Sequence, residues 1–220
     1  MKRRSTGFSY GVSTEDNIIR CFDMELEIHD GVFWKEEYMA WRWLTEHLPQ
    51  MNGKQFLEIG TGIGVTALYA ARSGAQRVVA VDINPNSVKN ARANAEKNNV
   101  RNIDIFESDI FSAVGKEQRF DYIYWSIPGV KAPGGYVAKN PIDLGVFDPD
   151  RKLLRRFYID GQSYLANGGQ LLLGFIEAEP SHDAEVIAVE CGLDLRLLAS
   201  REASQNNEKT YRLYSLKPKR

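Results

Sequence analysis

The sequence predicts an α/β domain in which helices cover both faces of a doubly wound, mostly parallel sheet of seven strands with a C-terminal antiparallel hairpin. From residue 54 onward, short apolar runs alternate with helical patterns, which is typical of a parallel sheet covered on both faces. A glycine-rich turn follows the first of these runs. The last two runs are joined by the polar loop 200–209, which is too short for a crossover helix, so we expect them to pair antiparallel.

Apolar periodicity and capping signals give the expected elements in order. The strands are expected at 55–59, 77–83, 102–106, 120–125, 169–175, 193–198 and 210–216. The helices between them are expected at 64–73, 84–98, 150–165 and 183–191. Asn84-Pro85 provides a cap and a first-turn proline for the second helix, and Gly192 ends the last one. Upstream, alternation over 18–28 predicts a short hairpin, and helical spacing predicts an amphipathic helix over 35–48.

Length and composition predict one globular domain over residues 1–220, in which residues 1–50 form part of the substrate side. The formal net charge of −1 gives no positive field to hold a phosphate backbone, so we expect no nucleic-acid partner. No apolar run reaches the ~18 residues of a membrane span, which predicts a cytoplasmic protein without a membrane partner. The two cysteines and three histidines have no metal-ligand spacing, so no metal is expected. No feature indicates an oligomeric state.

The glycine-rich turn is the segment Glu58-Ile59-Gly60-Thr61-Gly62-Ile63-Gly64, which lets the backbone turn tightly against a ligand. A dinucleotide site would place its third glycine one position later, at Val65, and the Glu58 carboxylate would repel a pyrophosphate. That carboxylate suits a ligand with an ammonium and a sulfonium group. S-adenosyl-L-methionine (SAM) has both, and its own carboxylate can use the helix N-terminus. The predicted cofactor-binding residues of this turn are Glu58, Gly60, Thr61, Gly62 and Gly64.

The next two strands also end in acids. Asp82 follows Gly62 by twenty residues and lies at the tip of the second strand, where it can accept both ribose hydroxyls of SAM. Asp109 can accept a hydrogen bond from the adenine amino group while Ile110 packs on the ring. A turn residue is the alternative for Asp82, and a loop acid for Asp109. We expect Ile83 and Phe33 to line the same cofactor site.

Together these motifs resemble the SAM-binding half of the class I methyltransferases, and the resemblance covers roughly residues 30–216. Gly31-Val32-Phe33-Trp34 and Phe147-Asp148-Pro149 are similar to segments of the methyltransferase small-domain group. The best-known members of that group modify a glutamine side chain of translation release factors. Those members have a proline where this chain has Trp34. They also carry an N-terminal helical domain, whereas this sequence has only about fifty residues before the glycine turn.

The fourth strand leads into Ser126-Ile127-Pro128-Gly129, which resembles the N/D/S-P-P-Y/F tetrapeptide of methyltransferases that act on planar nitrogens. In that tetrapeptide the first side chain and a neighbouring carbonyl accept the two N–H bonds of an NH2 group. Ser126 and Pro128 match the pattern, whereas Ile127 and Gly129 depart from it. The resemblance implies catalytic roles for Ser126 and Pro128 and substrate contacts at Ile127, Gly129 and Trp125. Trp125 is either a stacking face or a core residue.

The predicted function is methyl transfer from SAM to a nitrogen of a small molecule or an exposed protein side chain. Three alternatives remain: an O- or C-methyltransferase of a small metabolite, a nucleic-acid base N-methyltransferase, and a SAM-binding module without catalysis. A base methyltransferase would need a flipped base and a basic channel. Residues 129–146 are rich in glycine and proline, and their length predicts a mobile lid over the substrate.

Overall fold

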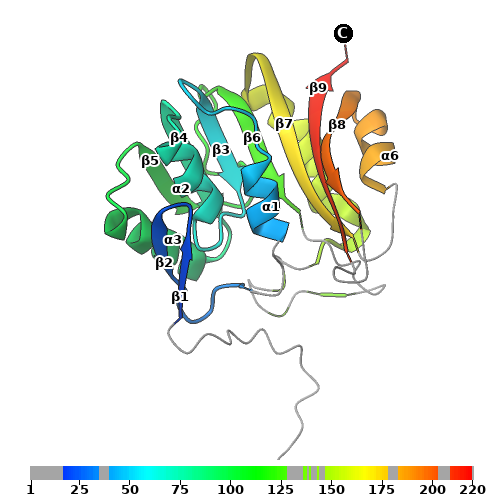
Figure 1. The fold of residues 1–220 in the computed structure, drawn as a ribbon. Coiled ribbons are helices and arrows are strands. Elements are labelled where there is room, and N and C mark those ends of the chain that lie inside the picture. The colour runs from blue at the N-terminus through cyan, green and yellow to red at the C-terminus, as the bar shows by residue number, and fades with distance from the viewer. Residues whose placement is uncertain are drawn as a thin grey trace, which may run out of the picture.

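The computed structural model describes residues 17–34, 40–127, 136–137, 139, 143, 147–177, 183–202 and 209–219. Within these residues one sheet has the strand order β5-β4-β3-β6-β7-β9-β8 (Figure 1). Its strands are β3 (Gln55–Ile59), β4 (Arg77–Asp82), β5 (Ile103–Glu107), β6 (Phe120–Ser126), β7 (Leu165–Glu177), β8 (Leu193–Arg201) and β9 (Thr210–Pro218). Strands β3 to β7 pair in parallel, and β9 pairs antiparallel with both β7 and β8. The predicted doubly wound sheet with its C-terminal hairpin is therefore confirmed.

The helices are α1 (Ala40–Glu46), α2 (Val65–Arg72), α3 (Pro85–Lys97), α5 (Lys152–Gly161) and α6 (Asp183–Glu190), with short 3₁₀ turns η1 (Pro149–Arg151) and η2 (Gln162–Tyr164). Of the helix predicted over 35–48, the structure contains α1, and residues 35–39 lie outside the described part. No helix in the described part of the chain is both long and apolar enough to cross a membrane.

The helix predicted over 150–165 is corrected at both ends. Asp150 and Arg151 adopt left-handed backbone angles (φ 56° and 54°), so the α-helical conformation begins only at Lys152. The Asp148 carboxylate accepts hydrogen bonds from the amides of Leu153 (2.9 Å) and Leu154 (3.0 Å), and these bonds satisfy the first turn. At the other end, Leu165 already pairs with β6, so β7 starts before the predicted residue 169.

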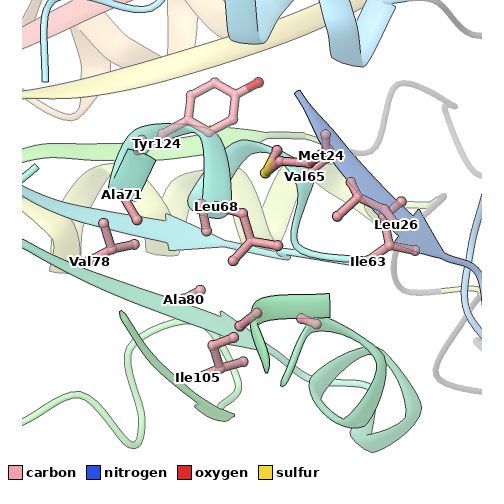
Figure 2. Packing of buried hydrophobic residues seen from close by; sticks show 14 of the residues in the cluster. Met24, Leu26, Ile63, Val65, Leu68, Ala71, Val78, Ala80, Ile105 and Tyr124 are labelled. Carbon is pink, nitrogen blue, oxygen red and sulfur yellow. The ribbon is translucent and has the colours of Figure 1, made fainter. Parts of the chain in front are cut away.

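The sheet has an apolar core on each face, because strand side chains alternate between the faces. Phe56 and Tyr124 belong to the cluster covered by the N-terminal hairpin and helices α1, α2 and α3. Leu57 and Ile123 belong to the cluster covered by α5 and α6. Figure 2 shows part of the first cluster, where hairpin side chains such as Leu26 lie near the start of α2. Both faces are thus buried, as the near-continuous apolar runs of β3 and β4 require.

The predicted N-terminal hairpin is present as β1 (Ile18–Cys21) and β2 (Met24–Glu27), paired antiparallel. The other edge of β2 is held by asparagine side chains of α3 and of the residue that caps its C-terminus, Asn98. Asn98, Asn94 and Asn90 accept hydrogen bonds from the backbone amides of Glu25 (3.1 Å), Glu27 (2.8 Å) and His29 (2.9 Å), respectively. We call these three residues the asparagine ladder. It fixes the hairpin, and the chain that leaves it, against the helix that follows β4.

Candidate active site

The glycine-rich turn lies at the carboxyl end of β3, the edge of the sheet at which such folds bind ligands. Gly60, Gly62 and Gly64 all have positive φ, at 66°, 57° and 90°. A Cβ at Gly60 would lie 3.1 Å from Nε1 of Trp125, and one at Gly64 would lie 3.1 Å from Cβ of Ala91. A Cβ at Gly62 would meet nothing within 4 Å, so this glycine borders open space. The turn therefore packs closely against the protein on one side and leaves room for a ligand on the other.

Glu58 is a buried carboxylate at the base of this turn, with 4% of its surface exposed. Its Oε2 accepts hydrogen bonds from Oγ1 of Thr61 (2.7 Å) and from the amide of Ala67 (3.0 Å). Burial raises the pKa of Glu58 to about 8, and those hydrogen bonds oppose only part of the effect. A buried acid of this kind gains most from a positively charged ligand group.

Asp82 ends β4, and its carboxylate joins the two loops at this edge. Oδ2 accepts from the amide of Gly62 (2.9 Å) and Oδ1 from the amide of Asn84 (2.9 Å). Burial raises its pKa, although the backbone hydrogen bonds favour the ionised form. Ile83 beside it is half-buried. Asp82 is thus more than a turn residue, because it sets the position of the glycine turn relative to β4.

The remaining predicted cofactor residues surround the same edge. The amide of Ser108, which follows β5, bonds the carbonyl of Asp82 (3.0 Å) and so brings Asp109 and Ile110 beside β4. Ile110 is buried with a positive φ of 52°. The Asp109 carboxylate, 45% exposed, is paired with Nη1 of Arg156 at 3.0 Å. Phe33 is half-buried and follows the hairpin.

The tetrapeptide begins beside this site, since β6 pairs with β3 through Glu58–Tyr124 and Ile59–Trp125. Ser126 is the last residue of β6 and is half-buried. Ile127 is buried, and its amide donates to the carbonyl of Gly174 (3.1 Å). Trp125 is 5% exposed and packs on Phe157 with ring centroids 5.4 Å apart, which is a core environment. Pro128, Gly129 and most of the predicted lid 129–146 lie outside the described residues.

Two groups of residues at the site were not predicted from the sequence. Tyr124, fully buried, lies on the face of β6 that also carries Ser126. The asparagine ladder on α3 positions the chain before Phe33, where Asn84 also donates from Nδ2 to the carbonyl of Gly31 (2.8 Å). The ladder has a visible signal, because asparagines four residues apart share one helix face. Tyr124 has none in one sequence, because its environment comes from strands distant along the chain.

These residues fit the cofactor inferred from the sequence. The open space at Gly62 gives the backbone room to approach a ligand, and the buried Glu58 offers a partner for positive charge. Asp82 retains carboxylate lone pairs beyond the backbone amides that it accepts, and these suit hydroxyl donors. The fold and this site define a class I SAM-dependent methyltransferase. The chain belongs to the methyltransferase small domain family, whose profile matches residues 23–133.

Two relatives share a described activity. A protein of Methanocaldococcus jannaschii, provisionally named a protein N5-glutamine methyltransferase, is 35% identical over 155 residues, which cover 69% of this chain and 76% of that protein. The release factor glutamine methyltransferase of Aliivibrio fischeri is 26% identical over 140 residues, covering 58% of this chain and 48% of that one.

Solved structures of methyltransferases have the same fold. A methyltransferase of Pyrococcus furiosus aligns with a TM-score of 0.64 at 20% identity, covering 90% of each chain. The 16S rRNA N2 G1207 methyltransferase of T. thermophilus, solved with SAM and guanosine, aligns with a TM-score of 0.63 at 24% identity over 92% of this chain and 50% of that one. These likenesses support the fold and say nothing of the methyl acceptor.

Proposed function

We propose that this enzyme transfers the methyl group of SAM to the side-chain amide nitrogen of a glutamine in a protein. The observation that carries the proposal is the position of Ser126 at the carboxyl end of β6, directly beside the strand that ends in Glu58 and the glycine turn. A hydrogen-bond acceptor at this place can hold an N–H group next to the cofactor. The two relatives named as glutamine methyltransferases support the choice of acceptor.

An amide nitrogen is a poor nucleophile because its lone pair is delocalised into the carbonyl group. The cofactor supplies an electrophilic methyl group on a sulfonium, so the protein mainly has to align the reacting atoms at about 3–3.5 Å. We assign Glu58 to the ammonium end of the cofactor and Asp82 to its ribose. Ser126 accepts one N–H of the amide and so fixes the direction of the lone pair. This acceptor also stabilises the positive charge that develops on nitrogen during transfer, until the methylated nitrogen releases one of its two protons to water.

Methyl transfer from tritiated SAM into fractionated cell extract tests the acceptor class. The extract is divided into protein, nucleic acid and small molecules before the purified enzyme is added. We expect label in the protein fraction, and we expect proteolysis with mass spectrometry to place the added methyl group on a glutamine side chain. Ser126→Ala provides a matched control, because it removes the proposed acceptor atom from a half-buried position without altering the cofactor residues.

The outcomes separate the proposed function from its rivals. Label in RNA that is lost after ribonuclease treatment would replace the proposal with base methylation. Label on a small molecule, or on an oxygen of the protein, would likewise contradict glutamine as the acceptor. Equal labelling by the wild type and by Ser126→Ala would contradict the assignment of Ser126.

A further inference from the structure

The hydroxyl of Tyr124 is a buried polar group close to Ser126, in the part of the site that we assign to the methyl acceptor. The cofactor contacts assigned above do not involve this hydroxyl. Tyr124 is 1% exposed, and its ring stacks on Phe56 with centroids 6.4 Å apart. In Figure 2 its hydroxyl points away from the aliphatic side chains of Ala71 and Val78. Buried hydroxyl groups are hydrogen-bonded in native proteins, so the neighbours of this oxygen indicate what it does.

Strand register brings those neighbours together. Tyr124 pairs with Glu58 on one side, and Ser126, two residues later on the same face, pairs with Gly174 on the other. A Cβ at Gly174 would lie 2.8 Å from the Tyr124 hydroxyl oxygen, so the oxygen reaches over β7 where only glycine leaves room. The Ser126 side chain lowers the pKa of the Tyr124 phenol, which places its hydroxyl in the neighbourhood of this oxygen. Burial and the nearby Glu58 raise the pKa of Tyr124, so the phenol stays neutral.

We propose that Tyr124 is a positioning residue: its phenolic oxygen accepts a hydrogen bond from the Ser126 hydroxyl and thereby turns the Ser126 lone pairs toward the N–H of the methyl acceptor. This inference rests on the proposed transfer to nitrogen, and it adds the group that makes a serine suitable for it. The two side chains lie on one face of β6, and Gly174 provides the space that the arrangement needs.

A serine needs such a partner because its hydroxyl rotates freely. The group has one donor and two acceptor lone pairs. If its proton pointed toward the acceptor nitrogen, it would bond the lone pair that must attack the methyl group. A phenolic oxygen that accepts a hydrogen bond from this hydroxyl prevents the unproductive orientation. An asparagine at position 126 would need no partner, because the acceptor atom of its amide is a carbonyl oxygen without a proton.

Tyr124→Phe tests the proposal by removing one atom while retaining the ring. We expect kcat to fall about 10- to 100-fold, the scale of a small loss of alignment, while the Kd for SAM stays within about twofold. Tyr158→Phe is the matched control. Tyr158 is equally buried, and its hydroxyl donates to the carbonyl of Ala184 (3.2 Å) in the other apolar cluster, away from the site. Tyr158→Phe should leave kcat unchanged.

Rescue separates positioning from structural support. In the double variant Tyr124→Phe/Ser126→Asn, the amide oxygen replaces the oriented hydroxyl, so kcat should recover relative to Tyr124→Phe. Wild-type kcat in Tyr124→Phe would overturn the proposal, as would loss without recovery in a variant that binds SAM normally. If Tyr124→Phe does not fold, the kcat of Ser126→Asn in the wild-type background is measured instead. We expect this variant to be active, because an asparagine amide needs no orienting partner. An inactive Ser126→Asn variant that still binds SAM would overturn the proposal.

The same assay keeps the two proposals distinguishable. The probe is the ribonuclease-treated protein fraction of the extract with tritiated SAM. The wild-type result decides whether a protein nitrogen is methylated, and therefore decides the proposed function. The ratio of kcat between Tyr124→Phe and Tyr158→Phe decides the role of Tyr124. A protein nitrogen methylated equally by both variants would retain the function and reject the positioning role.

Discussion

The cofactor part of the site and its acceptor part are built differently. Around the cofactor, the contacts join residues near one another in the chain or at successive strand ends, such as Thr61 with Glu58 and Asn84 with Asp82. Around the proposed acceptor position, Ser126 pairs with Gly174 of a different strand, and the absence of a side chain at Gly174 leaves room for the Tyr124 hydroxyl. Short-range geometry leaves a motif in the sequence, whereas geometry assembled across strands does not. The two parts should therefore respond differently to substitution.

The largest expected effect belongs to the acceptor part. Ser126→Ala should lower kcat by about 100-fold, because an interaction that matters chiefly in the transition state is lost. The Kd for SAM should stay close to the wild-type value. Steady-state kinetics together with calorimetry measure both quantities. If SAM binding falls in parallel with kcat, Ser126 supports the whole edge of the sheet and the two parts are not separable.

The reverse pattern is expected for the cofactor part. Asp82→Ala should weaken SAM binding by ~1–3 kcal/mol, since it removes a buried partner of backbone amides that we also assign to the ribose. Asp109→Ala is the comparison variant. Its carboxylate is half-exposed and paired with Arg156, so the loss of SAM affinity should be smaller. Titration calorimetry with SAM ranks the two variants, and equal losses would contradict the assignment of Asp82 to the ribose.

Stability gives a third contrast, within α3. Asn94 is fully buried, and it bonds the amide and carbonyl of Glu27 and the carbonyl of Ile63. Asn94→Ala leaves these groups unsatisfied and should lower the free energy of unfolding by about 1–3 kcal/mol. Asn86 has an exposed side chain in the first turn of the same helix, so Asn86→Ala should change stability little. Urea denaturation of both variants measures the difference, and equal stability would show that the ladder contributes nothing.

The smallest effect is the pH dependence that Glu58 confers. Its pKa of about 8 in the ligand-free protein exceeds the ordinary value of 4.5. Below pH 8, binding of a positively charged ligand must release its proton, so SAM affinity should rise by up to about tenfold per pH unit toward pH 8. The same shift stabilises the ligand-free fold fully below pH 4.5, and this stabilisation is lost as the pH rises to about 8.

Glu58→Gln is the control for that prediction, because it cannot titrate. Calorimetry at about pH 6.5 and about pH 7.5 should show a steeper change of SAM affinity for the wild type than for Glu58→Gln. Adenosine lacks the charged end of SAM, so its affinity for the wild type should be the same at both pH values. If SAM affinity changes equally with pH in the wild type and in Glu58→Gln, the assignment of Glu58 to the charged end of the cofactor is wrong.

Features that depend on residues close in the chain could be predicted from the sequence, whereas features that depend on packing between distant segments could not. Strand β3 has the predicted bounds, and the turn after it has the expected glycines, because apolar runs and positive-φ positions are local properties. The start of α5 was misplaced because the cap Asp148 acts five residues ahead, across the left-handed Asp150 and Arg151. The buried environments of Trp125 and Tyr124 depend on packing between distant segments, and periodicity in one sequence does not encode these partners.

The asparagine ladder has a geometric limit. Four residues of α-helix rise about 6.0 Å, whereas two residues of antiparallel strand rise about 6.8 Å, so each rung shifts the two elements by about 0.8 Å. The bond at Asn94, the central rung, is the shortest at 2.8 Å, and the outer rungs measure 2.9 and 3.1 Å. Side chains on one helix face can therefore accept hydrogen bonds from about three successive outward-facing amides of an extended segment. That length suffices to protect the free edge of a four-residue strand from pairing with another chain.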